Sequence, residues 1–336
     1  MNVARLYGRG DLRLADEPDP VPGAGEVLVR VTAVGICGSD LHWYDESGIG
    51  DAHLERPLVL GHEAAGVIAS GPRTGQRVAI DPNLPCDACP TCARGLGHLC
   101  PAVRFLGHSD TDGAMRQLIA WPERGLVPLP DAVDDVAGAM LEPLGVAIHA
   151  LRLARLEPGD SIGIFGAGPI GRLLIRLALA AGATTVVATD RLPHRVAAAR
   201  EDGALAELVD GGAEREALLL ALGGRLLDTV IEIAGDDDAI ATAAALVRPG
   251  GTLVAAGIPA GNEAVVPVSV LRRKGLDLRF ARRMNRVHDA AIALVVAGRI
   301  HPGEVVSHEF PLAAAGDAMA TAAARDGHKI VIRPDR

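Results

Sequence analysis

Four cysteines near residue 90 have a spacing that is typical of a metal site. The pattern is C-x2-C-x2-C-x7-C, and its members are Cys86, Cys89, Cys92 and Cys100. Four thiolates close a tetrahedral zinc shell and leave no position for water or substrate. Four free thiols without a common role would not need this spacing. We therefore predict a structural zinc ion that fixes a loop with little apolar material of its own.

A second set of possible metal ligands is spread over the first 150 residues. Cys37 lies in the segment G-I-C-G-S-D-L-H, His62 and Glu63 belong to G-H-E, and Glu142 belongs to L-E-P-L. Taken singly, these residues also fit a small buried hydrophobe, a paired polar residue and a surface acid. Together, a thiolate, an imidazole and a carboxylate suit a zinc site that keeps one position open for chemistry. Both sets together predict two zinc ions per chain.

A glycine-rich turn follows a short apolar run and precedes a helical pattern. Its G-x-G-x-x-G motif contains Gly166, Gly168, Pro169, Ile170 and Gly171. The first glycine permits a tight turn, the second lets the backbone approach a pyrophosphate, and the third lets helix and strand pack closely. Asp190 follows 19 residues after Gly171, where an acid can accept hydrogen bonds from ribose hydroxyls. Loop and acid together predict dinucleotide binding rather than a turn that binds nothing.

The same acid bears on the choice between NAD and NADP. A carboxylate at Asp190 would repel the 2′-phosphate of NADP, which favours NAD. Arg191 and Arg195 follow closely in the sequence, and an arginine can accommodate that phosphate. We expect NAD as the cofactor, while these two arginines leave NADP open.

Short strands and turns must position the possible metal ligands. Residues 27–37 are rich in β-branched side chains, and residues 77–80 form another short apolar run. Proline and glycine interrupt the first 150 residues at short intervals. This pattern favours an irregular, mostly-β region over alternating strands and helices.

Strand and helix patterns alternate after residue 150. Strands are expected at 161–165, 184–190, 228–235, 251–257 and 276–282, and helices at 169–182, 193–203 and 238–247. Such alternation predicts a parallel sheet with right-handed crossovers. The tail carries two helical patterns and a final strand, KIVIRP, and we expect it to rejoin the first domain. The expected domains are therefore 1–150, an inserted nucleotide-binding domain at 151–282, and a return at 283–336.

Composition excludes several classes of protein. The 336 residues are 49% hydrophobic, carry a formal net charge of −9 and are 2% aromatic. The negative charge and the scarcity of aromatic rings argue against a nucleic-acid partner. No stretch has the roughly 18 apolar residues of a membrane span, and the N-terminus lacks the apolar segment of a secretory signal. We expect a cytoplasmic protein with reduced thiols.

The order of these motifs resembles that of the zinc-containing medium-chain alcohol dehydrogenase family. The segments G-I-C-G-S-D-x-H, G-H-E, the four-cysteine loop, E-P-L and G-A-G-P-I-G span nearly the whole sequence. They match best the polyol branch, which contains sorbitol and xylitol dehydrogenases. The resemblance implies an α/β protein in which a GroES-like, mostly-β catalytic domain is interrupted by a doubly wound parallel-sheet (Rossmann) domain. We expect a homodimer or homotetramer.

The resemblance assigns roles around the second metal set. The positions that match catalytic zinc ligands are Cys37, His62, Glu63 and Glu142. Members of the family differ in which of the two glutamates completes the shell, and the sequence leaves that choice open. Asp40 matches an acid that orients the histidine ligand.

The resemblance also implies a proton path and a cofactor frame. Ser39 matches the hydroxyl residue that lies next to the substrate oxygen, and His42 matches the histidine that ends the proton relay. Asp190 and Arg195 match the acid and the arginine that frame the adenosine ribose.

Substrate selection is the part in which this sequence departs from the branch. Arg282 falls in a segment that contacts polyol and cofactor, whereas Trp43 and Arg283 stand where sorbitol dehydrogenases have tyrosines. The Glu142 carboxylate can accept hydrogen bonds from hydroxyls beside the reacting carbon. We expect a polyol or sugar acid to be oxidised at a secondary carbon to a ketone, with hydride transfer to NAD. L-Idonate- and L-threonine-type activities remain alternatives.

Two further alternatives differ more strongly. A zinc-free NADPH:quinone reductase on the same fold would lack the cysteine loop and the Cys/His/Glu set. A non-catalytic nucleotide-binding paralogue would be expected to have lost Ser39, His62 or Glu142, and all three are present. The other nine histidines show no spacing of a ligand set and are interpreted as surface or core residues.

Overall fold

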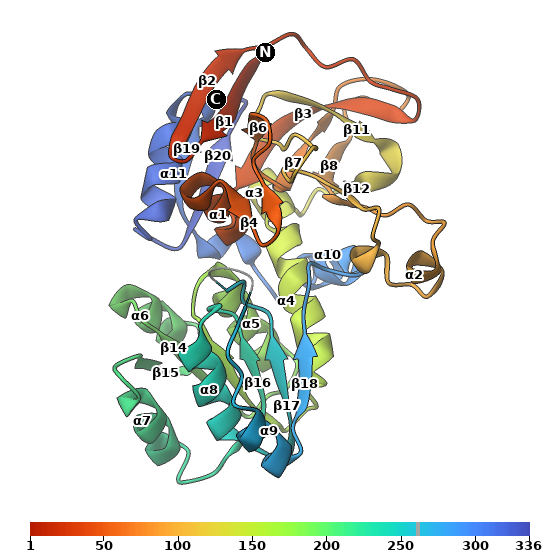
Figure 1. The fold of residues 1–336 in the computed structure, drawn as a ribbon. Helices are drawn as coiled ribbons and strands as arrows, with labels where there is room; N and C mark the ends of the chain where they lie inside the picture. Colours follow the sequence, from red (N-terminus) through yellow and green to blue (C-terminus); the bar gives the residue numbers. More distant parts are fainter. Residues whose placement is uncertain (260–262) are drawn as a thin grey trace. The chain divides into compact units, whose positions relative to one another are not determined.

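The computed structural model describes residues 1–259 and 263–336. These residues form two compact units, one made of Met1–Pro143 with His288–Arg336 and the other of Leu144–Val287. In the first unit the C-terminal segment, blue in Figure 1, lies beside the N-terminal strands, which are red.

The main sheet of the first unit is built around one long strand, β3 (Glu26–Gly35). Every residue from Val31 to Gly35 is buried, because both faces of the strand are covered. The sheet runs in the order β12-β8-β7-β3-β20-β19, and β11 also pairs with β3. The bounds are β7 (Glu63–Ile68), β8 (Arg77–Ile80), β11 (Leu118–Pro122), β12 (Leu126–Pro128), β19 (Val306–Pro311) and β20 (Lys329–Arg333). The final strand expected at KIVIRP is β20, and it pairs antiparallel with β3.

Smaller elements surround this sheet. The short strands are β1 (Asn2–Gly8), β2 (Asp11–Asp16), β4 (Gly48–Ile49), β5 (Ala52–His53), β6 (Leu58–Val59), β9 (Asn83–Leu84) and β10 (Arg104–Phe105). The helices are α1 (Gly38–Glu46), α2 (Pro90–Ala93), α3 (Asp135–Ala139), α10 (His288–Val296) and α11 (Ala315–Ala323), and α4 (Leu141–Ala154) contains the division between the units.

Helices α1, α2 and α3, and most of α4, lie in the first 150 residues, where the turn-rich sequence indicates mainly strands. Helix α1 begins where the Asp40 carboxylate accepts the backbone N–H of Cys37 at 2.8 Å. Helix α3 begins where the Asp134 carboxylate accepts the N–H of Ala137 at 2.7 Å. Such caps satisfy backbone donors that a short helix leaves unpaired. The acids that resemble turn residues in the sequence are therefore helix starts.

The second unit contains a parallel sheet in the order β15-β14-β13-β16-β17-β18. Its strands are β13 (Ser161–Phe165), β14 (Thr185–Asp190), β15 (Leu205–Leu208), β16 (Leu227–Glu232), β17 (Val247–Ala255) and β18 (Asp277–Phe280). The helices are α5 (Pro169–Ala180), α6 (Pro193–Glu201), α7 (Ala213–Ala221), α8 (Asp237–Leu246) and α9 (Val268–Lys274). The strand order reverses beside β13, as in a doubly wound nucleotide-binding sheet.

The expected alternation of strands and helices is confirmed in this unit. Each expected strand and helix is present. The sequence patterns did not predict β15, α7 and α9, which the structure also contains. Helix α5 begins at Pro169, where proline is pre-set for a first turn, and Gly182 takes a φ of +96° just beyond its end. Among the described residues, no helix is long and apolar enough to cross a membrane.

Candidate active site

The four-cysteine loop brings its sulfur atoms to the separations of a zinc–thiolate shell. A tetrahedron with zinc–sulfur bonds of about 2.3 Å has sulfur atoms about 3.8 Å apart. The observed Sγ–Sγ distances are 3.9 Å for Cys86–Cys92, 3.5 Å for Cys89–Cys92, 3.9 Å for Cys89–Cys100 and 3.5 Å for Cys86–Cys100. These distances fit one zinc ion that is bound by all four thiolates, which is the arrangement that the sequence predicts.

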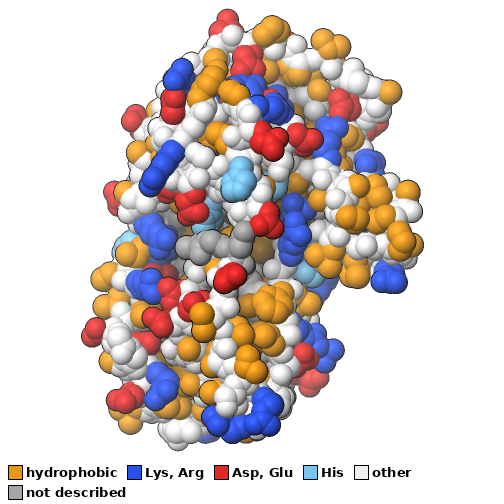
Figure 2. Space-filling view, in the orientation of Figure 1, with side chains coloured by type: hydrophobic (Ala, Val, Ile, Leu, Met, Phe, Trp, Pro, Cys, Tyr) orange, Lys and Arg blue, Asp and Glu red, His pale blue; other side chains and the backbone are white. Residues whose placement is uncertain are grey.

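The loop around these cysteines has little apolar core of its own. Leu96 and Leu99 are 38% and 42% exposed, and Figure 2 shows apolar side chains spread over the surface near α2. Backbone N–H groups turn toward the sulfurs, because Cys92 donates to Sγ of Cys89 and Cys86 donates to Sγ of Cys100. The bond from Cys92 is the main cause that lowers the pKa of Cys89 to about 6. Because this loop buries few apolar side chains, a bound metal would supply much of its stability.

The second set of ligands comes together at the end of β3 and the start of β7. Cys37, His62 and Glu63 offer ligand atoms that all lie within 4.8 Å of one another. His62 is 5% exposed and Glu63 is fully buried. Cys37 precedes α1, and His62 and Glu63 stand at the entrance of β7, so strand pairing holds the three side chains in place. A thiolate, an imidazole and a carboxylate at this distance can hold a zinc ion.

A buried acid orients the imidazole of this set. Asp40 lies with Oδ1 3.5 Å from Nδ1 of His62 and accepts N–H bonds from Cys37 at 2.8 Å and Gly61 at 3.1 Å. Burial opposes the charged form of His62, but Asp40 and Cys37 outweigh it and raise the pKa of His62 well above its usual value. Because Nδ1 of His62 faces Asp40, Nε2 is the nitrogen that is left to bind a metal ion.

One partner in this site has no sequence signal. The Nζ of Lys329 donates to Oε1 of Glu63 at 2.6 Å and to the carbonyl of Ile36 at 2.8 Å. Lys329 is 2% exposed and lies in β20, 266 residues along the chain from Glu63. Burial disfavours its charge, yet Glu63 and Cys37 raise the pKa of Lys329 above its usual value. A Cβ on Gly35 would lie 2.1 Å from Oε2 of Glu63, so only glycine leaves room for this pair.

Glu142 is the other acid of the region, at the start of α4. It is 6% exposed and does not belong to the compact group of Cys37, His62 and Glu63. Burial raises the pKa of Glu142 to about 7; Glu63 adds to this rise, and His62 and Lys329 oppose it. Glu142 is therefore an acid whose ionised form would be favoured by any added positive charge.

The two residues expected in the proton path both lie on α1. Ser39 is partly buried, with its Oγ 3.4 Å from Nε2 of His62. His42 lies one turn further, and its Nδ1 is 3.0 Å from Oε1 of the more exposed Glu46. Helix α1 thus carries a hydroxyl beside the metal set and an imidazole nearer to solvent.

Aromatic side chains pack near the metal set at positions that no sequence motif indicates. Trp43 is 1% exposed and belongs to the core of the first unit, where its ring meets His108 edge-on at 5.4 Å. Phe105 lies 5.5 Å from the ring of His62 and 6.3 Å from that of His108. The structure therefore places Trp43 inside a packed cluster, and Phe105 is the aromatic ring packed directly on His62. The residues that flank Phe105 and His108 in the sequence form no motif that would predict these ring contacts.

The glycine loop of the second unit is shaped by close backbone approaches. Gly166 has a φ of +105°, and a Cβ on Gly171 would lie 1.9 Å from its carbonyl oxygen. The carboxylate of Asp190 accepts the N–H of Ala167 at 2.9 Å, and Arg195 has Nη1 3.9 Å from the same acid. Glycine loop, acid and arginine are thus assembled as the sequence indicates.

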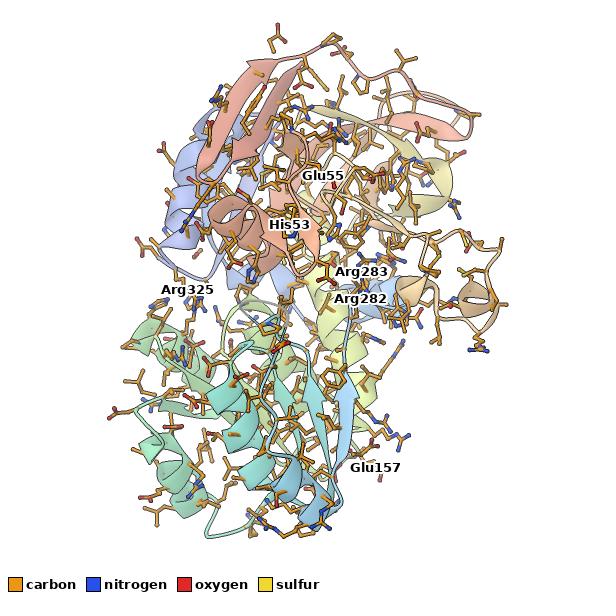
Figure 3. All side chains as sticks on the ribbon, viewed as in Figure 1. His53, Glu55, Glu157, Arg282, Arg283 and Arg325 are labelled. Atoms are coloured by element: carbon orange, nitrogen blue, oxygen red, sulfur yellow. The ribbon has the colours of Figure 1, made fainter. Side chains whose placement is uncertain are left out.

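Arg282 and Arg283 follow β18 in the second unit and are labelled in Figure 3. Arg282 is exposed, and Arg283 has a φ of +57°, an uncommon backbone conformation for a side chain of this size. Their contact with substrate stays a prediction.

Fold and site together define a zinc dehydrogenase with a GroES-like unit and a Rossmann-like unit. Residues 23–131 match the family described as alcohol dehydrogenase GroES-like domain, and residues 169–297 match the zinc-binding dehydrogenase family. The chain belongs to the zinc-containing medium-chain alcohol dehydrogenase family and matches its polyol branch, as the motifs indicate.

Individual relatives support this assignment along the whole chain. A sorbitol dehydrogenase of Bacillus subtilis is 33% identical over 100% of this chain and 98% of its own length. A sorbitol dehydrogenase of Gallus gallus is 36% identical over 99% and 97%, respectively. The crystal structure of L-idonate 5-dehydrogenase from Escherichia coli is similar with a TM-score of 0.87 and 29% identity, covering 99% of this chain and 97% of that one.

Proposed function

We propose that this chain oxidises a secondary alcohol of a polyol or sugar acid to a ketone, with NAD as the hydride acceptor. The observation that carries the proposal is the group of Cys37, His62 and Glu63, with Asp40 buried behind the imidazole. Such a set leaves a zinc position open to a substrate oxygen. The relatives named sorbitol and L-idonate dehydrogenase support this class of substrate.

The donor sets fit the two zinc ions. The four cysteines would hold a structural ion, and Cys37, His62 and Glu63 would hold the catalytic one. When bound, zinc supplies Lewis acidity and NAD supplies the hydride acceptor. Lys329 donates a hydrogen bond to Glu63 and fixes the orientation of its carboxylate, and Glu142 lies beside the set as the second acid.

The residues of α1 would move the proton. The Oγ of Ser39, which lies beside His62, would take the hydroxyl proton of the substrate and release its own hydroxyl proton in the same step. His42 lies further along the helix, with Glu46 as its neighbour, and would accept the proton that Ser39 releases. The substrate thus loses one proton from oxygen and one hydride from carbon, which leaves a ketone.

Substrate choice would rest on polar groups. Glu142 would accept a hydrogen bond from a hydroxyl next to the reacting carbon, and Arg282 and Arg283 would donate to further hydroxyls or to a terminal carboxylate. A simple alkyl alcohol would leave these groups unpaired, at about 1–3 kcal/mol for each. The glycine loop, Asp190 and Arg195 would hold NAD. The five free cysteines also support a reducing, cytoplasmic setting.

Steady-state kinetics with zinc-loaded protein test the proposal. We compare kcat/KM for sorbitol, xylitol, idonate, threonine and 2-butanol, each with NAD and with NADP, and measure zinc in the same samples. The expected result is turnover of a polyol or sugar acid with NAD. A preference for 2-butanol, or no turnover by zinc-loaded protein, would contradict it. A preference for threonine would keep the chemistry and change the substrate.

A further inference from the structure

An ion pair in the second unit joins the segments that follow β14 and β16. Arg191 follows β14 and donates from Nη2 to Oδ2 of Asp236 at 2.5 Å, and Asp236 follows β16. In the sheet, β13 lies between these two strands, and its carboxyl end is the start of the glycine loop. Backbone bonds tie that end to both sides, from Gly166 N–H to Thr189 and from Ile233 N–H to Phe165. The pair therefore spans the edge of the sheet at which a dinucleotide binds.

Asp236 is fixed by the helix that it caps, and its side chain is less exposed than that of Arg191. The Oδ1 of Asp236 caps α8 by accepting the N–H groups of Asp238 at 3.0 Å and Ala239 at 3.4 Å. The Asp236 side chain is 28% exposed, whereas that of Arg191 is 59% exposed. A fixed carboxylate thus holds a more exposed guanidinium toward the end of β16.

Arg191 is also the arginine best placed to change the cofactor preference. Arg195 lies against Asp190, with 3.9 Å between Nη1 and Oδ2, and is directed to the glycine loop. Arg191 directly follows Asp190, the acid expected at the ribose hydroxyls, and an arginine at that place can accommodate a 2′-phosphate.

We propose that Asp236 sets the preference for NAD by holding Arg191 in the ion pair with Asp236, away from the position of a 2′-phosphate. Two acids then discriminate against NADP. Asp190 repels the phosphate directly, and Asp236 withholds the cation that would attract it. This inference rests on the proposed function, because it concerns the nucleotide of the same reaction.

Calorimetric titration of the purified protein with NAD and with NADP gives both dissociation constants without turnover. The test variant is Asp236→Asn, whose amide oxygen can still cap α8. Asp238→Asn is the matched control, since it removes the same charge from the same exposed helix turn without touching Arg191. The double variant Asp236→Asn with Arg191→Leu asks whether the effect needs the arginine.

Asp236→Asn should tighten NADP binding by about two- to fivefold, the factor for an exposed ion pair, and leave NAD binding within about twofold. The gain should shrink in high salt, be absent in Asp238→Asn and disappear in the double variant. An unchanged NADP constant, or a gain that persists in the double variant, overturns the inference. Failure of the unaltered protein to bind either nucleotide overturns the proposed function instead.

Discussion

Replacing Lys329 with methionine removes a buried ammonium while keeping the length of the side chain. Lys329 is 2% exposed, and its partner Glu63 is fully buried. The ammonium donates to Oε1 of Glu63 and to the carbonyl of Ile36, so the variant leaves a buried carboxylate and a carbonyl without this donor. Loss of one member of such a pair costs more than the pair contributes, because the remaining charge stays out of water.

The expected loss follows from this burial. Removing one partner of a buried ion pair costs about 3–5 kcal/mol of unfolding free energy. For a unit of this size, each kcal/mol corresponds to about 2–4 °C, so the melting temperature should fall by about 6–20 °C. Zinc beside Glu63 would offset part of the unpaired charge. The fall in melting temperature of the zinc-saturated variant should therefore be near the lower end of this range.

The assay is thermal unfolding by circular dichroism in zinc-containing buffer, with urea unfolding as a second measurement. The double variant Lys329→Met with Glu63→Gln is the control, because it removes both charges and should recover most of the loss. If Lys329→Met unfolds within about 1 kcal/mol of the unaltered protein, the pair is solvated and the reasoning fails. The same holds if the double variant is as unstable as the single one.

Three further predictions concern the roles proposed for single side chains. Cys86→Ser should lower the melting temperature and bring the zinc content from two ions toward one, with kcat of the folded fraction kept; an unchanged melting temperature with lost kcat would place this cysteine in the reaction. Ser39→Ala should lower kcat by about 10²–10⁴-fold at unchanged zinc content, and full activity would exclude it from the proton path. Asp190→Ala should weaken NAD binding by about tenfold or more and narrow the preference over NADP. Higher kcat/KM of the unaltered protein with NADP would contradict that role of Asp190.

Local patterns were sufficient for most of the second unit. The strand expected at 161–165 is β13, and the helix expected at 193–203 is α6, because apolar periodicity and proline or glycine boundaries act over a few residues. Strand β15 escaped because it is short and lies at the sheet edge, where Leu205 and Leu208 are exposed. The sequence did not indicate helix α1, because Asp40, whose side chain caps the first turn, is also a typical turn residue.

The two metal sets differ in how far the sequence could define them. The four cysteines are close in the chain, and their spacing alone already specifies a closed shell. Cys37 and His62 are distant in the sequence, and the pairing of β3 with β7 brings their segments together, yet motif order suggested both residues. Lys329 and Phe105 contact the set through tertiary packing, and a lysine in a final strand or a lone phenylalanine has no spacing that reveals it.

The C-terminal strand contributes to the candidate metal site as well as to the sheet of the first unit. Strand β20 pairs with the end of β3, which places Lys329 over Gly35 and against Glu63. Glu63 lies near a second buried acid, Glu142, and raises the pKa of Glu142. Lys329 places a positive charge against Glu63, and the ion pair fixes where this carboxylate points. The last strand of the chain therefore places a cation against one residue of the proposed catalytic metal set.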